Sequence, residues 1–132
     1  MTRMWMGSPA SMCRQHLLGE HKEIHQLLGS LKKGLRVDGY VRNNCIEVSS
    51  IKERHDLLVE EMKERGYNHH SEMIAQKEVD IIAQYLPESH RNAMIDVEAS
   101  DSDRFHRCEA CRSLKINNNR ITKTMEKHND KV

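Results

Sequence analysis

The stretch that decides the fold covers residues 12–33 and reads MCRQHLLGEHKEIHQLLGSLKK. Large apolar side chains recur in it at spacings of seven, four and three residues, at Leu17, Ile24, Leu28 and Leu31. This period places them on one face, so the stretch predicts one long amphipathic α-helix. Lys32 and Lys33 suit a helix C-terminus, and Gly34 directly after them provides the stop.

Similar patterns predict three more helices further along the chain. Residues 49–65 carry a second apolar stripe behind two serines that can cap a helix. Residues 71–85 carry a third stripe, and Pro87 ends it because proline cannot continue a helix. Residues 101–114 predict a last short helix, with Phe105 as its apolar anchor.

Length and composition limit the architecture. A chain of 132 residues fits one domain with one core. Aromatic residues make up only 4%, which is poor material for a β-sandwich or barrel. Residues 35–48 read as a polar connector, and residues 117–132 have little to bury. We therefore predict an all-α, compact single domain of three main helices plus a short C-terminal helix over residues 1–116, followed by a flexible polar tail over residues 117–132.

Charge and hydropathy exclude several classes of protein. Lys and Arg number 21 and Asp and Glu 20, so the net charge of +1 argues against a strongly basic, nonspecific nucleic-acid binder. No apolar run approaches the roughly 20 residues that a membrane span needs. Residues 1–10 hold one Arg and no apolar run of the kind found in signal peptides. We therefore expect an intracellular protein without a membrane partner.

The N-terminus offers a candidate nucleophile. Thr2 follows Met1, and a small second residue usually permits removal of the initiator methionine. The α-amine of Thr2 would then have a pKa of roughly 7.7–8.0, against about 10.4 for a lysine. A fair fraction is unprotonated at neutral pH, so this amine can attack a carbonyl or a sugar C1′ and form a Schiff base. The alternative is an ordinary frayed terminus without a chemical role.

A polar face of the first predicted helix offers acid–base groups. His16, Glu20 and Glu23 lie at positions i, i+4 and i+7 and share one side, with Lys22 beside them. Two carboxylates next to a histidine and a lysine can transfer protons or stabilise a developing cation. The alternative is a solvated helix face crossed by ion pairs.

Histidine and cysteine offer candidate metal ligands. His21 and His25 have the i, i+4 spacing of a zinc pair, but Lys22 stands where the zincin pattern requires Glu. Cys108 and Cys111 form one CxxC pair, whereas a structural zinc site needs four ligands.

The missing ligands would have to come from elsewhere in the chain, and the candidates are Cys13, Cys45 and His90. Without a signal peptide, the four cysteines favour free thiols over a disulfide framework.

Three motifs at fixed positions together resemble one known family. They are Met1-Thr2-Arg3, QHLLGEHKE over residues 15–23, and KERGYN over residues 63–68. In this combination they resemble the pyrimidine-dimer DNA glycosylases of the bacteriophage endonuclease V type, over residues 1–30 and 52–70. The resemblance implies an all-α fold, no metal and no cofactor, and damaged double-stranded DNA as the partner. We expect the protein to act as a monomer.

The resemblance also assigns roles to individual residues. The family's N-terminal threonine amine, here that of Thr2, attacks C1′ of the damaged nucleotide, the glycosyl bond breaks, an imine forms, and β-elimination can then cut the strand. The family's catalytic glutamate corresponds to Glu23, which would stabilise the cationic sugar and move protons. The implied function is a DNA repair glycosylase with abasic-site lyase activity on damaged pyrimidines such as UV-induced cyclobutane dimers. The residues expected to bind DNA are Arg3, His16, Glu20, Lys22, Gln26, Arg65, Tyr67 and Asn68.

Some positions depart from the family pattern. Two family arginines that grip phosphates are here Lys22, which keeps the charge without the bidentate fork, and Gln26, which keeps only hydrogen bonding. The aromatic, basic C-terminus of the phage enzyme has no counterpart after Leu114. Two alternative functions stay open: a non-catalytic DNA-binding module on the same fold, and a zinc-binding protein that uses Cys108 and Cys111.

Overall fold

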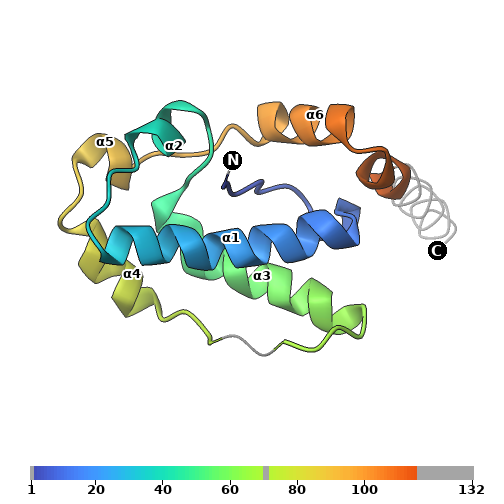
Figure 1. Ribbon diagram of the computed structural model, residues 1–132, viewed down its shortest axis with the longest axis horizontal. Coiled ribbons are helices and arrows are strands. Elements are labelled where there is room, and N and C mark those ends of the chain that lie inside the picture. The colour runs from blue at the N-terminus through green and yellow to red at the C-terminus, as the bar shows by residue number, and fades with distance from the viewer. Residues whose placement is uncertain (1, 70–71, 116–132) are drawn as a thin grey trace, which may run out of the picture.

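The computed structural model describes residues 2–69 and 72–115, which form helices and loops without a β-strand (Figure 1). Two short 3-10 helices are η1 (Pro9–Ser11) and η2 (Val48–Ser50). The α-helices are α1 (Arg14–Lys32), α2 (Asp38–Arg42), α3 (Ile51–Glu64), α4 (Gln76–Ala83), α5 (Glu88–Arg91) and α6 (Val97–Arg107). Residues 109–115 are also helical. The prediction of an all-α fold is confirmed.

Helices α1 and α3 pack side by side and supply the centre of the hydrophobic core (Figure 1). The predicted stripe on α1 is buried, and Leu17 and Ile24 are fully enclosed. Ile51 and Leu58 of α3 are equally enclosed on the facing side. Burying side chains of this size stabilises a fold by roughly 1.5–3 kcal/mol each. This pair of helices is therefore the frame that holds the other elements.

The two long helices begin and end close to their predicted limits, whereas α4 is shorter than predicted. Helix α1 covers 14–32 where the sequence predicts 12–33, and α3 covers 51–64 where it predicts 49–65. Helix α4 covers 76–83 where the sequence predicts 71–85, and residues 72–75 before it are not helical. The predicted cap at Ser71 lies outside the described residues.

The last predicted helix is divided into two parts. Helix α6 begins at Val97, four residues before the predicted start, because the Asp96 side chain caps it by accepting a hydrogen bond from the backbone N–H of Ala99 (3.1 Å). The chain leaves the helix at Cys108, whose φ of −123° and ψ of 107° are extended, and becomes helical again at residue 109. The prediction of one helix over 101–114 is therefore wrong, since the helix is broken at Cys108, and Cys111 lies in the helical stretch that follows the break.

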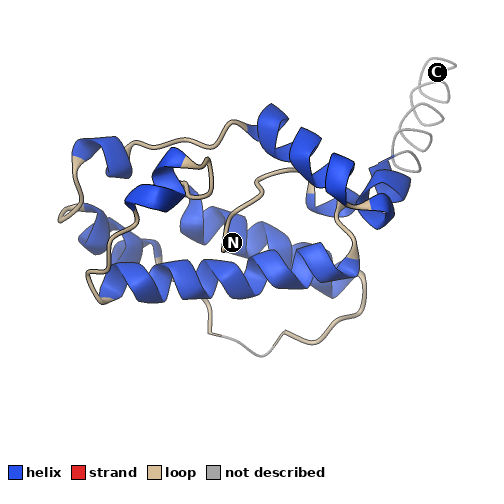
Figure 2. Cartoon of the chain, turned by 45° about the horizontal axis from the view of Figure 1, so that its top comes forward, coloured by secondary structure: helices blue, strands red, loops and turns tan. Residues whose placement is uncertain are grey.

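Residues 2–13 form an irregular segment, and both views place its N-terminal end beside the middle of α1 (Figures 1 and 2). A buried irregular segment needs partners for its backbone polar groups. Three hydrogen bonds from guanidinium groups to carbonyl oxygens supply them: Arg54 to Gly7 (2.6 Å), Arg65 to Met12 (2.7 Å) and Arg104 to Ser11 (2.8 Å). The backbone N–H of Met4 also donates to the Cys45 carbonyl (2.7 Å). These contacts fix the start of the chain against the helices.

Two expectations concern the chain as a whole. Within residues 2–69 and 72–115, no helix is long and apolar enough to cross a membrane. The predicted tail, residues 117–132, lies outside the described part of the chain, and the single domain over residues 1–116 stays a prediction.

Candidate active site

A cavity of about 280 Å³ opens between the N-terminal segment and α1. The residues that line it are Arg3, Trp5, Gln15, His16, Gly19 and Glu23. Gln15, Gly19 and Glu23 follow one another at four-residue spacing, so they share one face of α1. Gly19 keeps this face open, because a Cβ added to it would meet no atom within 4 Å. Two residues of the predicted polar face, His16 and Glu23, therefore line a cavity beside the first residues of the chain.

The Glu23 carboxyl lies beside the N-terminal residues. Burial raises the pKa of Glu23 above its ordinary value, and a hydrogen bond from the backbone of Arg3 acts in the opposite direction. The Arg3 nitrogen belongs to the peptide bond with Thr2, and backbone bond lengths keep the nitrogen of Thr2 within about 4 Å of it. An amine at Thr2 would thus lie close to a carboxyl whose raised pKa suits proton transfer. The structure brings together the two residues that the sequence analysis made catalytic.

Arg3 and His16 both contact the ring of Trp5, and all three residues line the cavity. The Arg3 guanidinium lies 3.8 Å from the centre of the Trp5 ring, and the His16 ring meets Trp5 edge-on at 5.4 Å between centroids. Arg3 is also held by α6, where it donates to the Ser100 hydroxyl (3.0 Å) and forms an ion pair with Asp103 (3.3 Å). The sequence analysis gave Trp5 no role, although the aromatic ring joins two of the predicted residues.

Glu20 differs from its expected role in DNA binding. Its side chain is fully buried between α1 and α3, where Arg54 donates to both of its oxygens at 2.6 and 2.9 Å. Arg54 is buried as well and also holds the Gly7 carbonyl. Glu20 therefore has no surface to offer to DNA in this structure, because a bidentate ion pair occupies it. Its contribution is to hold the arginine that fixes the N-terminal segment.

The remaining predicted DNA-binding residues divide into two groups. Lys22, Gln26 and Asn68 are exposed and open to a ligand. Arg65 is half-buried, and its guanidinium donates to two carbonyl oxygens of the N-terminal segment. Tyr67 is half-buried too, with the guanidinium of Arg14 4.7 Å from its ring centre.

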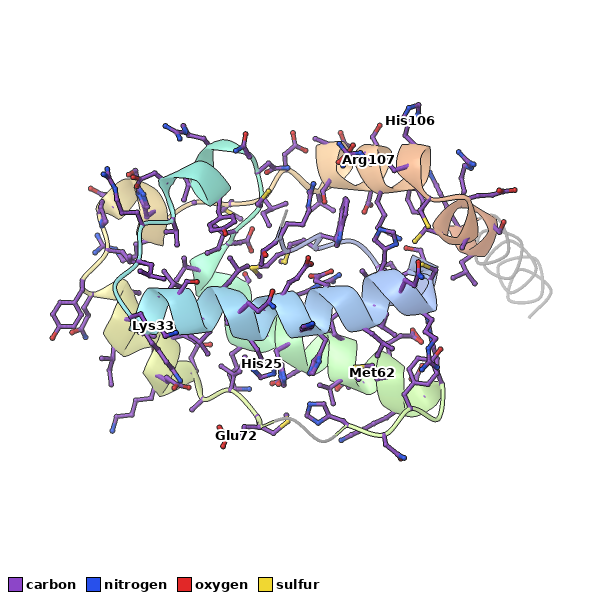
Figure 3. All side chains as sticks on the ribbon, viewed as in Figure 1. His25, Lys33, Met62, Glu72, His106 and Arg107 are labelled. Atoms are coloured by element: carbon purple, nitrogen blue, oxygen red, sulfur yellow. The ribbon has the colours of Figure 1, made fainter. Side chains whose placement is uncertain are left out.

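Four histidines gather between α1, α3 and the loop after α3, and we call them the histidine cluster: His21, His25, His55 and His69. His25, labelled in Figure 3, lies with its ring 4.9 Å from that of His55. Burial, followed by the nearby His55, His25 and His69, lowers the pKa of His21 to about 4. Three of the four rings, those of His21, His55 and His69, are close enough to share a metal ion. The helical spacing had revealed only the pair on α1.

A second group with metal-ligating atoms lies where α1 begins, and we call it the thiol–histidine cluster: Cys13, His16, Cys108 and Cys111. All four ligand atoms lie within 4.8 Å of one another. Of the three candidates for completing the CxxC pair, the structure selects Cys13. His90 pairs with Asp38, and Cys45 donates to the Asn43 carbonyl (3.2 Å). His16 had been assigned to DNA, so its place in this cluster was missed.

Comparison with known proteins agrees with the resemblance seen in the sequence. The family model described as pyrimidine dimer DNA glycosylase matches residues 1–75, more than half of the chain. The matched residues include every side chain that lines the cavity, whereas Cys108 and Cys111 lie beyond them. No curated protein and no solved structure matches the chain. The match over residues 1–75 is sufficient to conclude that this chain belongs to the pyrimidine dimer DNA glycosylase family.

Proposed function

We propose that the protein is a DNA repair glycosylase with abasic-site lyase activity, acting on damaged pyrimidines in duplex DNA such as cyclobutane dimers. Family membership supports a glycosylase of this class. The single observation that carries the assignment is the cavity that Arg3 and Glu23 line together, since Thr2 is bonded to Arg3 and its amine would lie near this acid–base group.

The proposed reaction uses the α-amine of Thr2 as the nucleophile. Its electron pair forms a bond to C1′ while the glycosyl bond breaks, and the base leaves with the bonding electrons and takes up a proton. The C1′–O4′ bond of the sugar ring then breaks, O4′ takes up a proton, and the amine gives up its protons as the imine forms between Thr2 and C1′. Loss of a proton from C2′ then expels the phosphate at C3′, which cuts the strand.

In this scheme the Glu23 carboxylate stabilises the positive charge that develops on the sugar, and its protonated form donates the protons needed for ring opening. The raised pKa of Glu23 favours the protonated form, which the second task needs. In this scheme a base leaves the stack to make room for the reacting groups, so the DNA would be kinked, and weak stacking at a lesion helps to meet that cost.

DNA binding would rest on a local surface, because the net charge of the chain is only +1. Lys22, Gln26 and Asn68 are exposed and suited to contacts with the phosphate backbone. We expect binding to be modest and to weaken as salt rises.

A second candidate function is DNA binding without catalysis. The observation that favours it is the position of Arg3, which is tied to α6 by Ser100 and Asp103. An arginine held in this way has to be released before it can enter DNA.

The test is strand incision of a duplex with one cyclobutane dimer. One preparation begins at Thr2, as checked by mass spectrometry, and a matched preparation carries one extra residue before Thr2. We expect incision by the first and none by the second, because the extra peptide bond removes the amine. Equal incision by both would overturn the role of Thr2. Binding of the dimer duplex without incision by the first would support the non-catalytic function instead.

A further inference from the structure

The thiol–histidine cluster assembles from two distant pairs of residues. Cys13 directly precedes α1 and His16 lies in its first turn, three residues later. Cys108 and Cys111 lie 95 and 98 positions further along from Cys13 and have the same three-residue offset. Two ligands separated by two residues are typical of structural zinc sites, in which two such pairs from different parts of the chain bind one ion.

Three distances between ligand atoms of the cluster are close to the edges of a tetrahedron around a metal. The Sγ atoms of Cys13 and Cys108 are 3.8 Å apart. The Nδ1 atom of His16 lies 3.2 Å from the Cys13 sulfur and 3.5 Å from the Cys111 sulfur. Tetrahedral zinc with Zn–S of about 2.3 Å and Zn–N of about 2.0–2.1 Å has S···S edges of about 3.8 Å and S···N edges of about 3.5 Å. The same distance is too long for a Cys13–Cys108 disulfide, because bonded sulfurs lie about 2.05 Å apart, and all the cysteines of the cluster are free thiols.

The backbone around the cluster donates hydrogen bonds to the sulfurs. The N–H of Cys13 donates to the Cys111 sulfur (3.3 Å), and the backbone of Ala110 and Cys111 donates to the Cys108 sulfur. Such donors stabilise negative charge on metal-bound thiolates and orient them. The backbone is extended at Cys108, between α6 and residues 109–115. This break places the Cys108 sulfur next to that of Cys13.

A buried arginine supplies an independent indication of negative charge. Arg104 of α6 is fully buried, and its side chain hydrogen-bonds the Cys111 sulfur. Its Nε has no hydrogen-bond partner among the described residues, and its ion pair with Asp101 is long at 3.5 Å. A buried guanidinium is costly unless an anion pairs with it. Its guanidinium also donates to the Ser11 carbonyl and hydroxyl (2.8 and 2.9 Å), and thiolates in the cluster would add the negative charge that these neutral groups lack.

We propose that the thiol–histidine cluster binds one structural zinc ion. Three thiolates and a neutral imidazole around Zn²⁺ give the site a net charge of −1, which complements Arg104. Binding releases the three thiol protons to solvent and needs no oxidant or reductant. The zinc ties the start of α1 to the C-terminal helices, and it holds His16 through Nδ1. The proton of that imidazole is then fixed on Nε2, on the ring that forms an edge contact with Trp5 in the cavity wall.

The first experiment is elemental analysis of the untagged protein, purified without added metal or chelator. We expect about one zinc per chain. Cys108→Ser and Cys111→Ser should each lose most of it. Cys45→Ser is the matched control, because it removes another buried thiol outside the cluster, and it should keep the metal. Wild-type protein without zinc, or with a disulfide among these cysteines, would overturn the proposal.

A cobalt spectrum separates this cluster from the histidine cluster and does not depend on whether the serine variants fold. Wild-type protein loaded with Co²⁺ should show thiolate-to-cobalt charge-transfer absorption, which a site made of imidazoles cannot give. His16→Cys should keep one zinc and strengthen that absorption, since it adds a fourth thiolate. Zinc without a cobalt–thiolate band, or zinc retained after both Cys108 and Cys111 are replaced by Ser, would place the metal elsewhere and contradict the proposal.

Discussion

Glu20 and Glu23 lie three residues apart on α1, yet their surroundings differ. Glu20 is fully buried, and Arg54 binds both of its oxygens. Glu23 lines an open cavity, and burial raises its pKa while the Arg3 backbone donates one hydrogen bond to it. One carboxylate is saturated by a guanidinium and holds the fold, whereas the other keeps free capacity to exchange protons. The two residues are of the same type and lie on the same helix. Their roles differ because Arg54 of α3 binds Glu20 and no such cation among the described residues binds Glu23.

The largest expected effect is on activity, from Glu23→Gln. The amide keeps the size of the side chain but cannot transfer a proton, so we expect incision to fall by about 10²–10⁴-fold, the range for general acid–base groups. The melting temperature should stay close to that of the wild type. Glu60→Gln, an exposed position on α3, is the control. Incision by Glu23→Gln within a few fold of the wild type would remove the distinction between the two carboxylates.

The next effect is on stability, from Glu20→Gln. Removing one partner of a buried ion pair leaves the Arg54 charge uncompensated and costs about 3–5 kcal/mol of unfolding free energy. Urea unfolding measures it, with Glu64→Gln as the exposed control on α3. A loss below about 1 kcal/mol, typical of an exposed ion pair, would show that Glu20 does not hold the fold.

The histidine cluster makes the stability of the fold depend on pH. The pKa of His21 is about 4 in the folded protein, below the value near 6.5 of an unfolded histidine. Between these values the unfolded chain binds more protons, so stability should fall as pH drops from about 6.5 to 4, by about 3 kcal/mol at most. Urea unfolding at several pH values measures this slope. His21→Gln should flatten it, and an unchanged slope in that variant would assign the acid sensitivity to other groups.

The smallest effect concerns Gly19, which directly precedes Glu20 and lies one helical turn before Glu23. Gly19→Ala and Gly29→Ala both add a Cβ that meets nothing within 4 Å, and each should raise stability by up to about 1 kcal/mol through helix propensity. Only Gly19 lines the cavity, so only Gly19→Ala should also lower incision. If both variants keep full activity, DNA does not occupy the part of the cavity beside Gly19.

The sequence was a good guide where the signal is local. The leucine and isoleucine spacing predicted α1 and α3 nearly to their ends, and the polar face of α1 contained both His16 and Glu23. The burial of Glu20 in an ion pair could not be predicted from local spacing, since its partner Arg54 lies 34 positions away on another helix.

The same limit applies to the metal-ligating residues. Cys13 and Cys108 are 95 positions apart, and they meet because α6 packs on the N-terminal segment that leads into α1. The CxxC pair alone identified half of the cluster. The equal three-residue offset of Cys13 and His16 was the available signal for the other half.

The most direct test of the central claim is borohydride trapping of the untagged protein on an oligonucleotide with one abasic site. Borohydride reduces an imine to a stable amine, so the cross-linked residue can be identified by mass spectrometry. The proposed mechanism predicts a covalent adduct on the α-amine of Thr2, beside Glu23. An adduct on a lysine, or no adduct from protein shown to begin at Thr2, would contradict it.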